Sequence, residues 1–387
     1  MVHIVGWGHT KFGKAADQDL EALIVEAGRE ALAHAGIDAR DVDGIWVGHF
    51  NGGMVGDGFP SSLALAIDKD LRFVPATRLE NACASGSAAV YAARNAIDAG
   101  RAKITLVIGV EKMTHLPTAE VGAALGHASY QREEAGLTFP QVFAGFAQAY
   151  ANTWGDPTMA MARIAAKNHA NAMKNPLAQM HKELPAEYCA EVSDRNPMVA
   201  PPLKVTDCSL VSDGAAALIM VADDLVGNFR QAVHLRAAEQ VNDYLPMSRR
   251  DLTRFEGPRA AISRALDAAG TTIGDIDLAE VHDCFTIAEL LLYEAMGLAE
   301  PGQGARALDE GIVYPDGALP VNLSGGLKAK GHPVGATGVS MHVLVSRQVT
   351  GQAGQMQKSG ASLGLVFNMG GSGVANYASV LEGVRGG

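Results

Sequence analysis

The chain has 387 residues, of which 48% are hydrophobic and 19% charged, and its formal net charge is −11. This balance excludes a disordered chain, and it argues against binding to nucleic acid or to an anionic membrane, which needs positive charge. The length exceeds that of most single hydrophobic cores, so two domains or an internal duplication are expected.

The first predicted elements alternate between strand and helix. Residues 2–7 are apolar and strand-like, and apolar residues between 20 and 27 recur at the spacing of an amphipathic helix that ends near Gly36. Residues 45–47 indicate a second strand. After a further helix, the apolar run 104–110 is typical of a buried parallel strand. This order predicts an α/β protein.

The same pattern returns later in the chain. Residues 41–47 and 275–281 share an acidic pair followed by a strand-like run. If this reflects a duplication, the helix that follows Cys83 corresponds to residues 333–345. The two helices would then meet at a pseudo-two-fold axis, with Cys83 close to His332.

The four cysteines lie far apart and include no Cys-x-x-Cys pair. This spacing fits neither a disulfide framework nor a structural zinc site, and it indicates a reducing compartment. The N-terminus lacks the features of a signal peptide, so we expect a cytoplasmic protein. Residues 359–381 carry no charge, but their glycines and serines favour two buried strands over a membrane span.

Cys83 lies in residues 81–89, where small residues lead into a helical apolar run. Unpaired N–H groups and the helix dipole favour a thiolate at such an N-terminus. Cys83 is therefore the candidate nucleophile. The alternative is a packing role, since free cysteines are among the most buried residues.

Three further motifs stand out, namely His282-Asp283-Cys284-Phe285, the glycine-rich run 325–338 around His332, and Asn368-Met369-Gly370-Gly371-Ser372-Gly373. The cysteine helix followed by these three motifs, in this order, resembles the arrangement found in the thiolase superfamily. More narrowly, the chain is similar to sterol-carrier-protein-2-type and archaeal acetoacetyl-CoA thiolases. Residues 167–176 and 207–216 also resemble that subgroup, so the resemblance covers essentially the whole chain.

The resemblance implies a five-layered αβαβα fold built from two similar halves. Residues 1–115 and 206–231 would form the N-terminal half, 116–205 a loop domain that covers CoA, and 232–387 the C-terminal half. It also implies a homodimer, or a tetramer of paired dimers, with acyl-CoA and CoA as substrates and no tightly bound cofactor. The implied reaction forms or cleaves 3-oxoacyl-CoA through an acyl-cysteine intermediate.

The resemblance also implies a role for each motif. Cys83 carries the acyl group, and His332 takes the Cys83 proton and then helps to bind a thioester oxygen. Cys284 removes a proton from the α-carbon of the second acyl group, while His282 contributes to an oxyanion site. The backbone N–H groups of Cys83 and Gly370 form a second oxyanion hole. The residue chemistry supports these roles independently. An activated acyl group needs a soft nucleophile, and a free thiol, with a pKa of about 8.5, needs a base to ionise at neutral pH.

One departure and one alternative remain within these motifs. Asn368 stands where many thiolases have a second catalytic cysteine, which leaves Cys284 as the acid and base. His282 has the alternative role of orienting Asp283. A metal ion is not expected from this motif, because adjacent residues on a strand point to opposite faces.

Two other functions stay open. The first is an acyltransferase or retro-aldolase that acts on a non-standard acceptor together with a small OB-fold (zinc-ribbon) partner protein. The second is a non-catalytic paralogue that binds acyl-CoA. The joint presence of Cys83, Cys284 and His332 argues against this second function.

Overall fold

A mixed nine-stranded sheet runs through the computed structural model, which describes residues 1–384. Its strands are β1 (Val2–His9), β2 (Gly44–Gly48), β3 (Ala76–Leu79), β4 (Ile104–Glu111), β7 (Gly214–Ala222), β8 (Ala232–Asn242), β9 (Leu278–Val281), β10 (Leu363–Gly370) and β11 (Ala375–Val384). They lie side by side in the order β3-β2-β4-β7-β1-β8-β11-β10-β9.

The strand pairing repeats in the two halves of the sheet. β2 pairs parallel with β4, β4 antiparallel with β7, and β7 antiparallel with β1. In the second half β9, β10, β11 and β8 follow the same sequence of parallel and antiparallel pairs. The halves meet through a short antiparallel pairing of β1 with β8. This repeat confirms the duplication predicted from the sequence.

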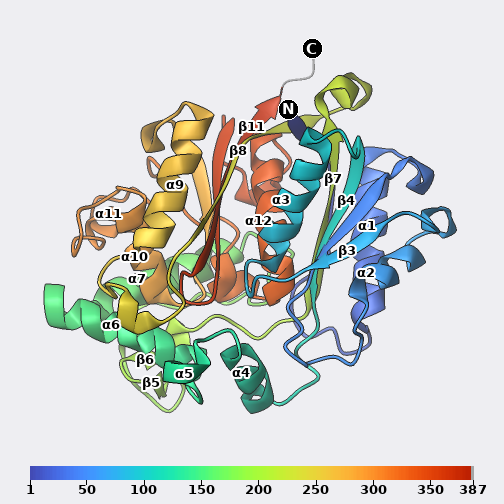
Figure 1. Cartoon of the computed structure of the whole chain (residues 1–387). Helices are drawn as coiled ribbons and strands as arrows, with labels where there is room; N and C mark the ends of the chain where they lie inside the picture. The colour runs from blue at the N-terminus through green and yellow to red at the C-terminus, as the bar shows by residue number, and fades with distance from the viewer. Residues whose placement is uncertain (385–387) are drawn as a thin grey trace.

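Helices and sheet halves form five layers. The principal helices are α1 (Leu20–Ala35), α3 (Ser85–Asp98), α9 (Glu256–Ala269), α10 (Thr286–Ala295) and α12 (Val334–Val349). Figure 1 shows α3 and α12 between the two sheet halves, α1 outside one half, and α9 and α10 outside the other. Buried apolar clusters fill the spaces between these layers. The predicted αβαβα architecture is confirmed.

The outer helix α1 shows how local sequence sets these elements. The Asp19 side chain accepts a hydrogen bond from the Ala22 N–H at 2.8 Å and caps the helix start. Gly36 ends it in a left-handed conformation, with φ of 70°. The apolar residues between them are buried against β1 and β7. The predicted helix and its end are both confirmed.

The central helices α3 and α12 approach each other backbone to backbone. A Cβ atom on Gly86 would lie 2.8 Å from the carbonyl oxygen of Gly335. A Cβ atom on Gly338 would overlap the backbone nitrogen of Ser87. Only glycine permits this approach. It brings the residues that precede each helix, including Cys83 and His332, to one place.

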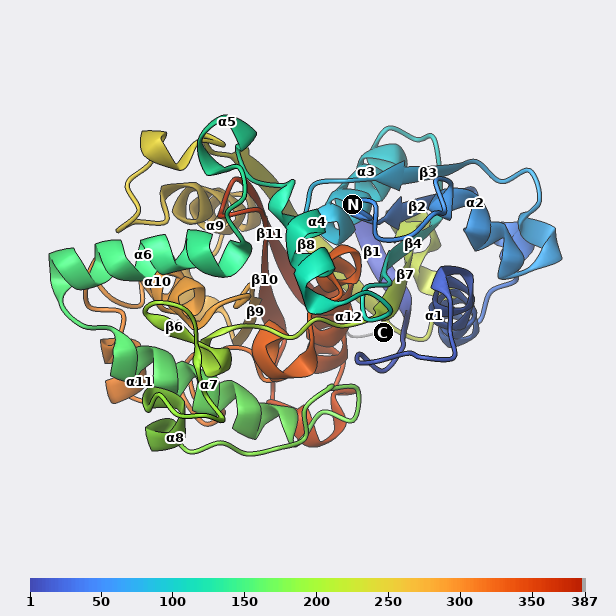
Figure 2. The same cartoon turned by 90° about the horizontal axis from the view of Figure 1, so that it is seen from below.

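A long insertion joins β4 to β7. It contains α4 (Thr118–Gly126), α5 (Gln131–Glu134), α6 (Phe139–Trp154), α7 (Thr158–Ala172), α8 (Ala186–Ala190), β5 (Met198–Ala200) and β6 (Leu203–Lys204). Figure 1 shows these elements gathered at the lower end of the layers, and Figure 2 views them from that side. Within residues 1–384, no helix combines the length and the apolar character needed to cross a membrane.

Candidate active site

Cys83 lies in a tight turn immediately before α3. The Ser85 hydroxyl holds this turn, because it donates to the Ala82 carbonyl at 2.6 Å and accepts from the Asn81 N–H at 2.9 Å. Ala82 has φ of 51°, a left-handed conformation that costs a residue with a Cβ atom about 1 to 3 kcal/mol. The neighbouring hydrogen bonds therefore maintain a strained backbone next to the candidate nucleophile.

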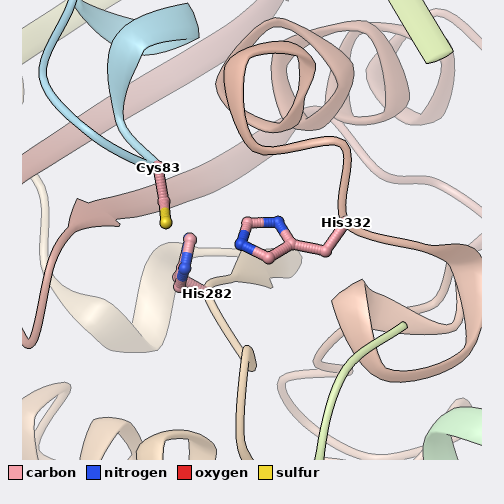
Figure 3. A group of neighbouring side chains, drawn as sticks. All are labelled: Cys83, His282 and His332. Atoms are coloured by element: carbon pink, nitrogen blue, oxygen red, sulfur yellow. The ribbon is translucent and has the colours of Figure 1, made fainter. Parts of the chain in front are cut away.

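Three side chains from different parts of the chain converge at this turn. The Cys83 sulfur and one ring nitrogen each of His282 and His332 lie within 4.8 Å of one another. Their residues are 9%, 0% and 6% exposed, and the two imidazole centroids are 5.1 Å apart. Figure 3 shows the His332 ring directed toward Cys83 and His282. The proximity of Cys83 and His332 predicted from the duplication is confirmed.

The loop that carries His332 fixes the orientation of its ring. The His332 backbone N–H donates to the Ser212 hydroxyl at 2.9 Å. Its Nδ1 lies 2.7 Å from Oγ1 of Thr337, and that hydroxyl donates to the Pro333 carbonyl at 3.1 Å. The hydroxyl oxygen therefore accepts from Nδ1–H, which leaves Nε2 as a free acceptor. Burial, followed by the charge of Lys330, lowers the pKa of His332 to about 3, so the ring is a neutral base.

His282 follows β9 and contacts a different partner. Its Nδ1 lies 2.9 Å from Nδ2 of Asn368. Its Nε2 is buried and has no hydrogen-bond partner among residues 1–384. Burial, followed by His332 and Lys330, lowers the pKa of His282 well below its ordinary value. This ring is therefore also neutral near pH 7.

Asp283 does not take part in holding His282. Its carboxylate instead accepts the backbone N–H groups of Leu327 and Lys328, at 2.6 and 3.2 Å. These residues belong to Gly326–Lys330, a single π-helical turn of a kind that often marks functional sites. Burial, followed by the carboxylate of Glu289, raises the pKa of Asp283 to about 7. Asp283 thus fixes the loop that leads to His332.

The Cys83 thiol keeps its proton in the resting site. Burial raises the pKa of Cys83 to about 12; a hydrogen bond from the Gly371 N–H lowers it, and the charge of Glu111 raises it further. The position before α3 favours a thiolate. We attribute the net rise to burial, which outweighs that helix-terminus effect. A neutral thiol beside a neutral imidazole with a free Nε2 can pass its proton to that nitrogen when an acyl group arrives.

A cavity of about 440 Å³ opens onto Cys83, Cys284 and His332. Most of its wall is apolar, with side chains from the insertion such as Val121 and Phe139. Burial, followed by Cys83 and Asp283, raises the pKa of the Cys284 thiol well above its ordinary value. A wider hollow of about 870 Å³ is lined by Asn81 and Ala82 of the Cys83 turn, but Cys83, Cys284 and His332 do not line it. The smaller cavity is therefore the candidate substrate site.

The final glycine motif packs directly against the nucleophile turn. A Cβ atom on Gly370 would overlap the carbonyl oxygen of Asn81. Gly371 has φ of 63°, and its N–H, rather than that of Gly370, lowers the pKa of Cys83 by a hydrogen bond. Sequence reasoning did not single out this Gly371 contact. The oxyanion hole from the N–H groups of Cys83 and Gly370 stays a prediction.

Glu111 is a further residue that sequence reasoning missed. It is fully buried at the end of β4 and accepts the N–H groups of Phe50 and Gly335, each at 3.0 Å. It also lies 3.1 Å from Nε2 of His49. Glu111 therefore ties the loop after β2 to the start of α12. The available signal was an acidic residue at the end of an otherwise apolar strand.

The three converging donor atoms also have a spacing at which a metal ion could be held. This set of Cys83, His282 and His332 differs from the adjacent set His282, Asp283 and Cys284 that the sequence led us to consider. A metal would require an unprotonated nitrogen from each ring. The expectation that no metal binds stays a prediction.

Comparisons with known proteins agree with this fold. The thiolase N-terminal domain family matches residues 2–224, and the thiolase C-terminal domain-like family matches residues 238–383. The acetyl-CoA acetyltransferase of Methanothermobacter thermautotrophicus is 39% identical over 378 residues, which covers 96% of this chain and 97% of that protein. Human sterol carrier protein 2 is 33% identical, over 95% of this chain and 70% of that protein.

Two solved structures show the same fold at lower identity. The Ltp2-ChsH2(DUF35) aldolase aligns with a TM-score of 0.83 and 22% identity, over 99% of this chain and 98% of that chain. Human mitochondrial 3-ketoacyl-CoA thiolase in complex with CoA aligns with a TM-score of 0.75 and 18% identity, again over 99% and 98%. Because the two family matches together span most of the residues, and a full-length relative is 39% identical, the chain belongs to the thiolase family of acyltransferase enzymes.

Proposed function

We propose that this protein is an acyl-CoA C-acyltransferase that forms or cleaves 3-oxoacyl-CoA through an acyl group on Cys83. The observation that carries the proposal is the convergence of Cys83, His282 and His332 beside a cavity that Cys284 also lines. The relative named acetyl-CoA acetyltransferase supports acetyl-CoA as the product of cleavage and the donor in synthesis.

In the cleavage direction, the Cys83 sulfur attacks the 3-oxo carbonyl while its proton moves to Nε2 of His332. The bond between carbons 2 and 3 breaks, and the resulting enolate takes a proton from the Cys284 thiol. Free CoA then attacks the acyl-Cys83 thioester and gives its proton to the Cys284 thiolate, and the His332 proton returns to Cys83. The raised pKa of Cys284 fits its role in protonating the enolate, because the thiol must be protonated to act as an acid.

The direct test is thiolysis of acetoacetyl-CoA by the purified protein in the presence of free CoA, followed by the absorbance of the enolate. We expect turnover by the native chain. The Cys284→Ala variant should lose carbon–carbon bond cleavage and formation but still form acetyl-Cys83 from acetyl-CoA, more slowly, because CoA then leaves as a thiolate without a proton from Cys284. Unchanged turnover in that variant would remove Cys284 from the mechanism.

Residues of the insertion form a cavity entrance whose charge suits CoA. Lys182 and Arg195 line the cavity and are exposed to solvent. Positive side chains at an otherwise apolar channel favour the phosphates of CoA, with its acyl arm directed toward Cys83. This arrangement supports the expectation that the insertion covers CoA, which binds as substrate rather than as a resident cofactor.

We include a homodimer and a cytoplasmic location in the proposal. β3 ends the sheet, and an unpaired edge strand is a surface to which a second copy can add. Phe73 and Phe59, in the segments between β2 and β3, are 86% and 77% exposed, as apolar contact residues would be in a free subunit. Light scattering would distinguish monomer, dimer and tetramer.

The cytoplasmic location is supported by the cysteines. The free state of all four cysteines fits a reducing compartment.

A second candidate function is a retro-aldolase or acyltransferase that needs a small OB-fold partner. One observation favours it: Asn368 takes the place of a second acid/base cysteine, which would suit a non-standard acceptor. The Ltp2-ChsH2(DUF35) aldolase, which has the same fold, carries a DUF35 component in its name. Thiolysis of acetoacetyl-CoA by this protein alone would make the partner unnecessary.

A further inference from the structure

We propose that Asn368 is a positioning residue that keeps the proton of His282 on Nε2. The His282 ring then faces the reacting group as a hydrogen-bond donor, while the His332 ring faces it as a base. This inference rests on the acyltransferase function proposed above. It assigns a role to Asn368, which stands in the final glycine motif where many thiolases have a cysteine.

The partners of the Asn368 side chain fix which way its amide points. Nδ2 lies 3.2 Å from the carbonyl oxygen of Cys83, and a carbonyl can only accept a hydrogen bond. Oδ1 lies 2.8 Å from the Ser87 hydroxyl, which donates to it. The reverse orientation would set two oxygens against each other at the Cys83 carbonyl. The amide nitrogen therefore faces both Cys83 and His282.

This orientation determines the tautomer of His282. The second N–H of Asn368 Nδ2 is available to Nδ1 of His282, 2.9 Å away, so Nδ1 must be the acceptor. A neutral imidazole carries one proton, which is then on Nε2. Burial lowers the pKa of His282, which keeps the ring neutral.

The proton on Nε2 has no acceptor among the residues that the structure describes. Nε2 of His282 is buried and unpartnered among residues 1–384, and its ring lies edge-on to that of His332. A buried N–H without a partner is unfavourable. The negative oxygen that develops when Cys83 attacks a thioester would provide the missing acceptor. The resting site is thus arranged for the transition state rather than for the free protein.

Three other buried histidines show the opposite pattern. Nδ1 of His9, His169 and His342 lies 2.6, 2.9 and 2.7 Å from a backbone carbonyl oxygen. Because a carbonyl only accepts, each of these rings carries its proton on Nδ1. The amide contact of His282 reverses this pattern at the site where a donor is needed. An amide has no acidic proton to exchange, so Asn368 itself performs no acid–base step.

The test is a long-range proton–nitrogen correlation spectrum of the full-length protein labelled with ¹⁵N-histidine. The His282→Gln variant identifies the His282 signal by its loss. We expect the native spectrum to show the proton on Nε2. Asn368→Asp, which presents only acceptors to Nδ1, should move the proton from Nε2 to Nδ1. Asn368→Ala should give a mixture of tautomers.

Kinetics provide the second readout. Loss of the Nε2–H donor should slow acylation by acetyl-CoA about 10²-fold in Asn368→Asp. Alkylation of Cys83 by iodoacetamide, which needs no oxyanion donor, should change less than about 3-fold. A general loss of packing would slow both reactions together. If Asn368→Asp does not fold, the native spectrum and Asn368→Ala still decide the proposal.

Ser379→Ala is a matched control. It removes the hydrogen-bond partner of another buried histidine, His342, whose Nε2 lies 2.9 Å from the Ser379 hydroxyl. The His282 signal and the acylation rate should stay unchanged.

A native His282 that carries its proton on Nδ1, or an Asn368→Asp variant with an unchanged tautomer, would overturn the inference. An Nε2–H signal in a protein that forms no acyl-enzyme would instead refute the proposed function alone.

Discussion

The two histidine-bearing segments of the second half, 281–285 and 325–335, bring chemically identical rings to the Cys83 sulfur but hold them differently. His332 meets a hydroxyl oxygen at Nδ1, from Thr337, whereas His282 meets an amide nitrogen there, from Asn368. Both rings are buried and both have lowered pKa values. The partner at Nδ1, rather than burial, therefore determines which ring has a free acceptor at Nε2 and which has a donor there.

The duplication explains why the base is paired with the thiol. Cys83 and His332 occupy matching places, each just before one of the two central helices. The crossing of α3 and α12 at their glycines therefore joins them. His282 has no such counterpart and reaches the site from the end of β9. Substitution of each ring, and then of its partner at Nδ1, would separate the two roles.

The largest effect is expected for His332→Ala. This variant removes the group that accepts the Cys83 proton, and loss of such a base typically costs 10²- to 10⁴-fold, so acylation by acetyl-CoA should fall about 10³-fold. Alkylation of Cys83 near neutral pH should slow as well. Time-resolved intact-mass measurements would follow both reactions. Alkylation at the native rate would show that His332 does not activate the thiol.

His282→Ala should slow acylation about 10²-fold, the cost of losing one oxyanion donor. Alkylation of Cys83 should stay close to native, because that reaction develops no oxyanion. The two histidine variants would then differ in kind as well as in size. Equal losses in both reactions for both variants would erase the distinction between base and donor.

The pH dependence of alkylation tests the resting protonation state. Because burial raises the pKa of Cys83 to about 12, the thiolate fraction should increase about tenfold per pH unit between pH 7 and 9. The rate constant of His332→Ala, which lacks the internal base, should rise in parallel, whereas the native rate should depend less on pH because neutral His332 can take the proton throughout this range. A His332→Ala rate that stays flat would contradict a protonated resting thiol.

The smallest effect is expected from the partner of His332. Thr337→Val removes the hydroxyl oxygen at Nδ1, so the ring can turn or change tautomer, and acylation should slow about 10-fold. Thr337→Ser keeps the hydroxyl and should remain near the native rate. A native acylation rate in Thr337→Ser but not in Thr337→Val would show that the hydroxyl positions the ring and that packing of the methyl group is not responsible. Equal rates for valine and serine would deny the hydroxyl a role.

Much of this arrangement could be predicted because it follows from local patterns. Strand and helix periodicity, the end of α1 at Gly36 and the repeated order of elements each lie within short stretches of sequence. Together they were enough to place Cys83 near His332. The strand at 104–110 was expected among parallel neighbours, and it does pair parallel with β2, but it pairs antiparallel with β7, which follows the insertion. Its apolar run reports burial on both faces and does not encode strand direction.

The partners that distinguish the two histidines could not be predicted. The contact between Asn368 and His282 joins β10 to the end of β9, and the hydrogen bond from Gly371 to Cys83 joins the two halves of the molecule. Neither contact leaves a periodic or spacing signal, because each depends on how finished elements pack. Asn368 was visible only as a departure from an expected cysteine.

We propose that Cys83 carries the acyl group, and mapping the acylated residue would show this directly. The native protein, Cys284→Ala and Cys83→Ala would each be incubated with acetyl-CoA, quenched in acid, and the modified residue mapped by peptide mass spectrometry. We predict one acetyl group on Cys83 in the first two proteins and none in the third. An acetyl group that persists in Cys83→Ala, or that maps to another residue in the native protein, would contradict the account.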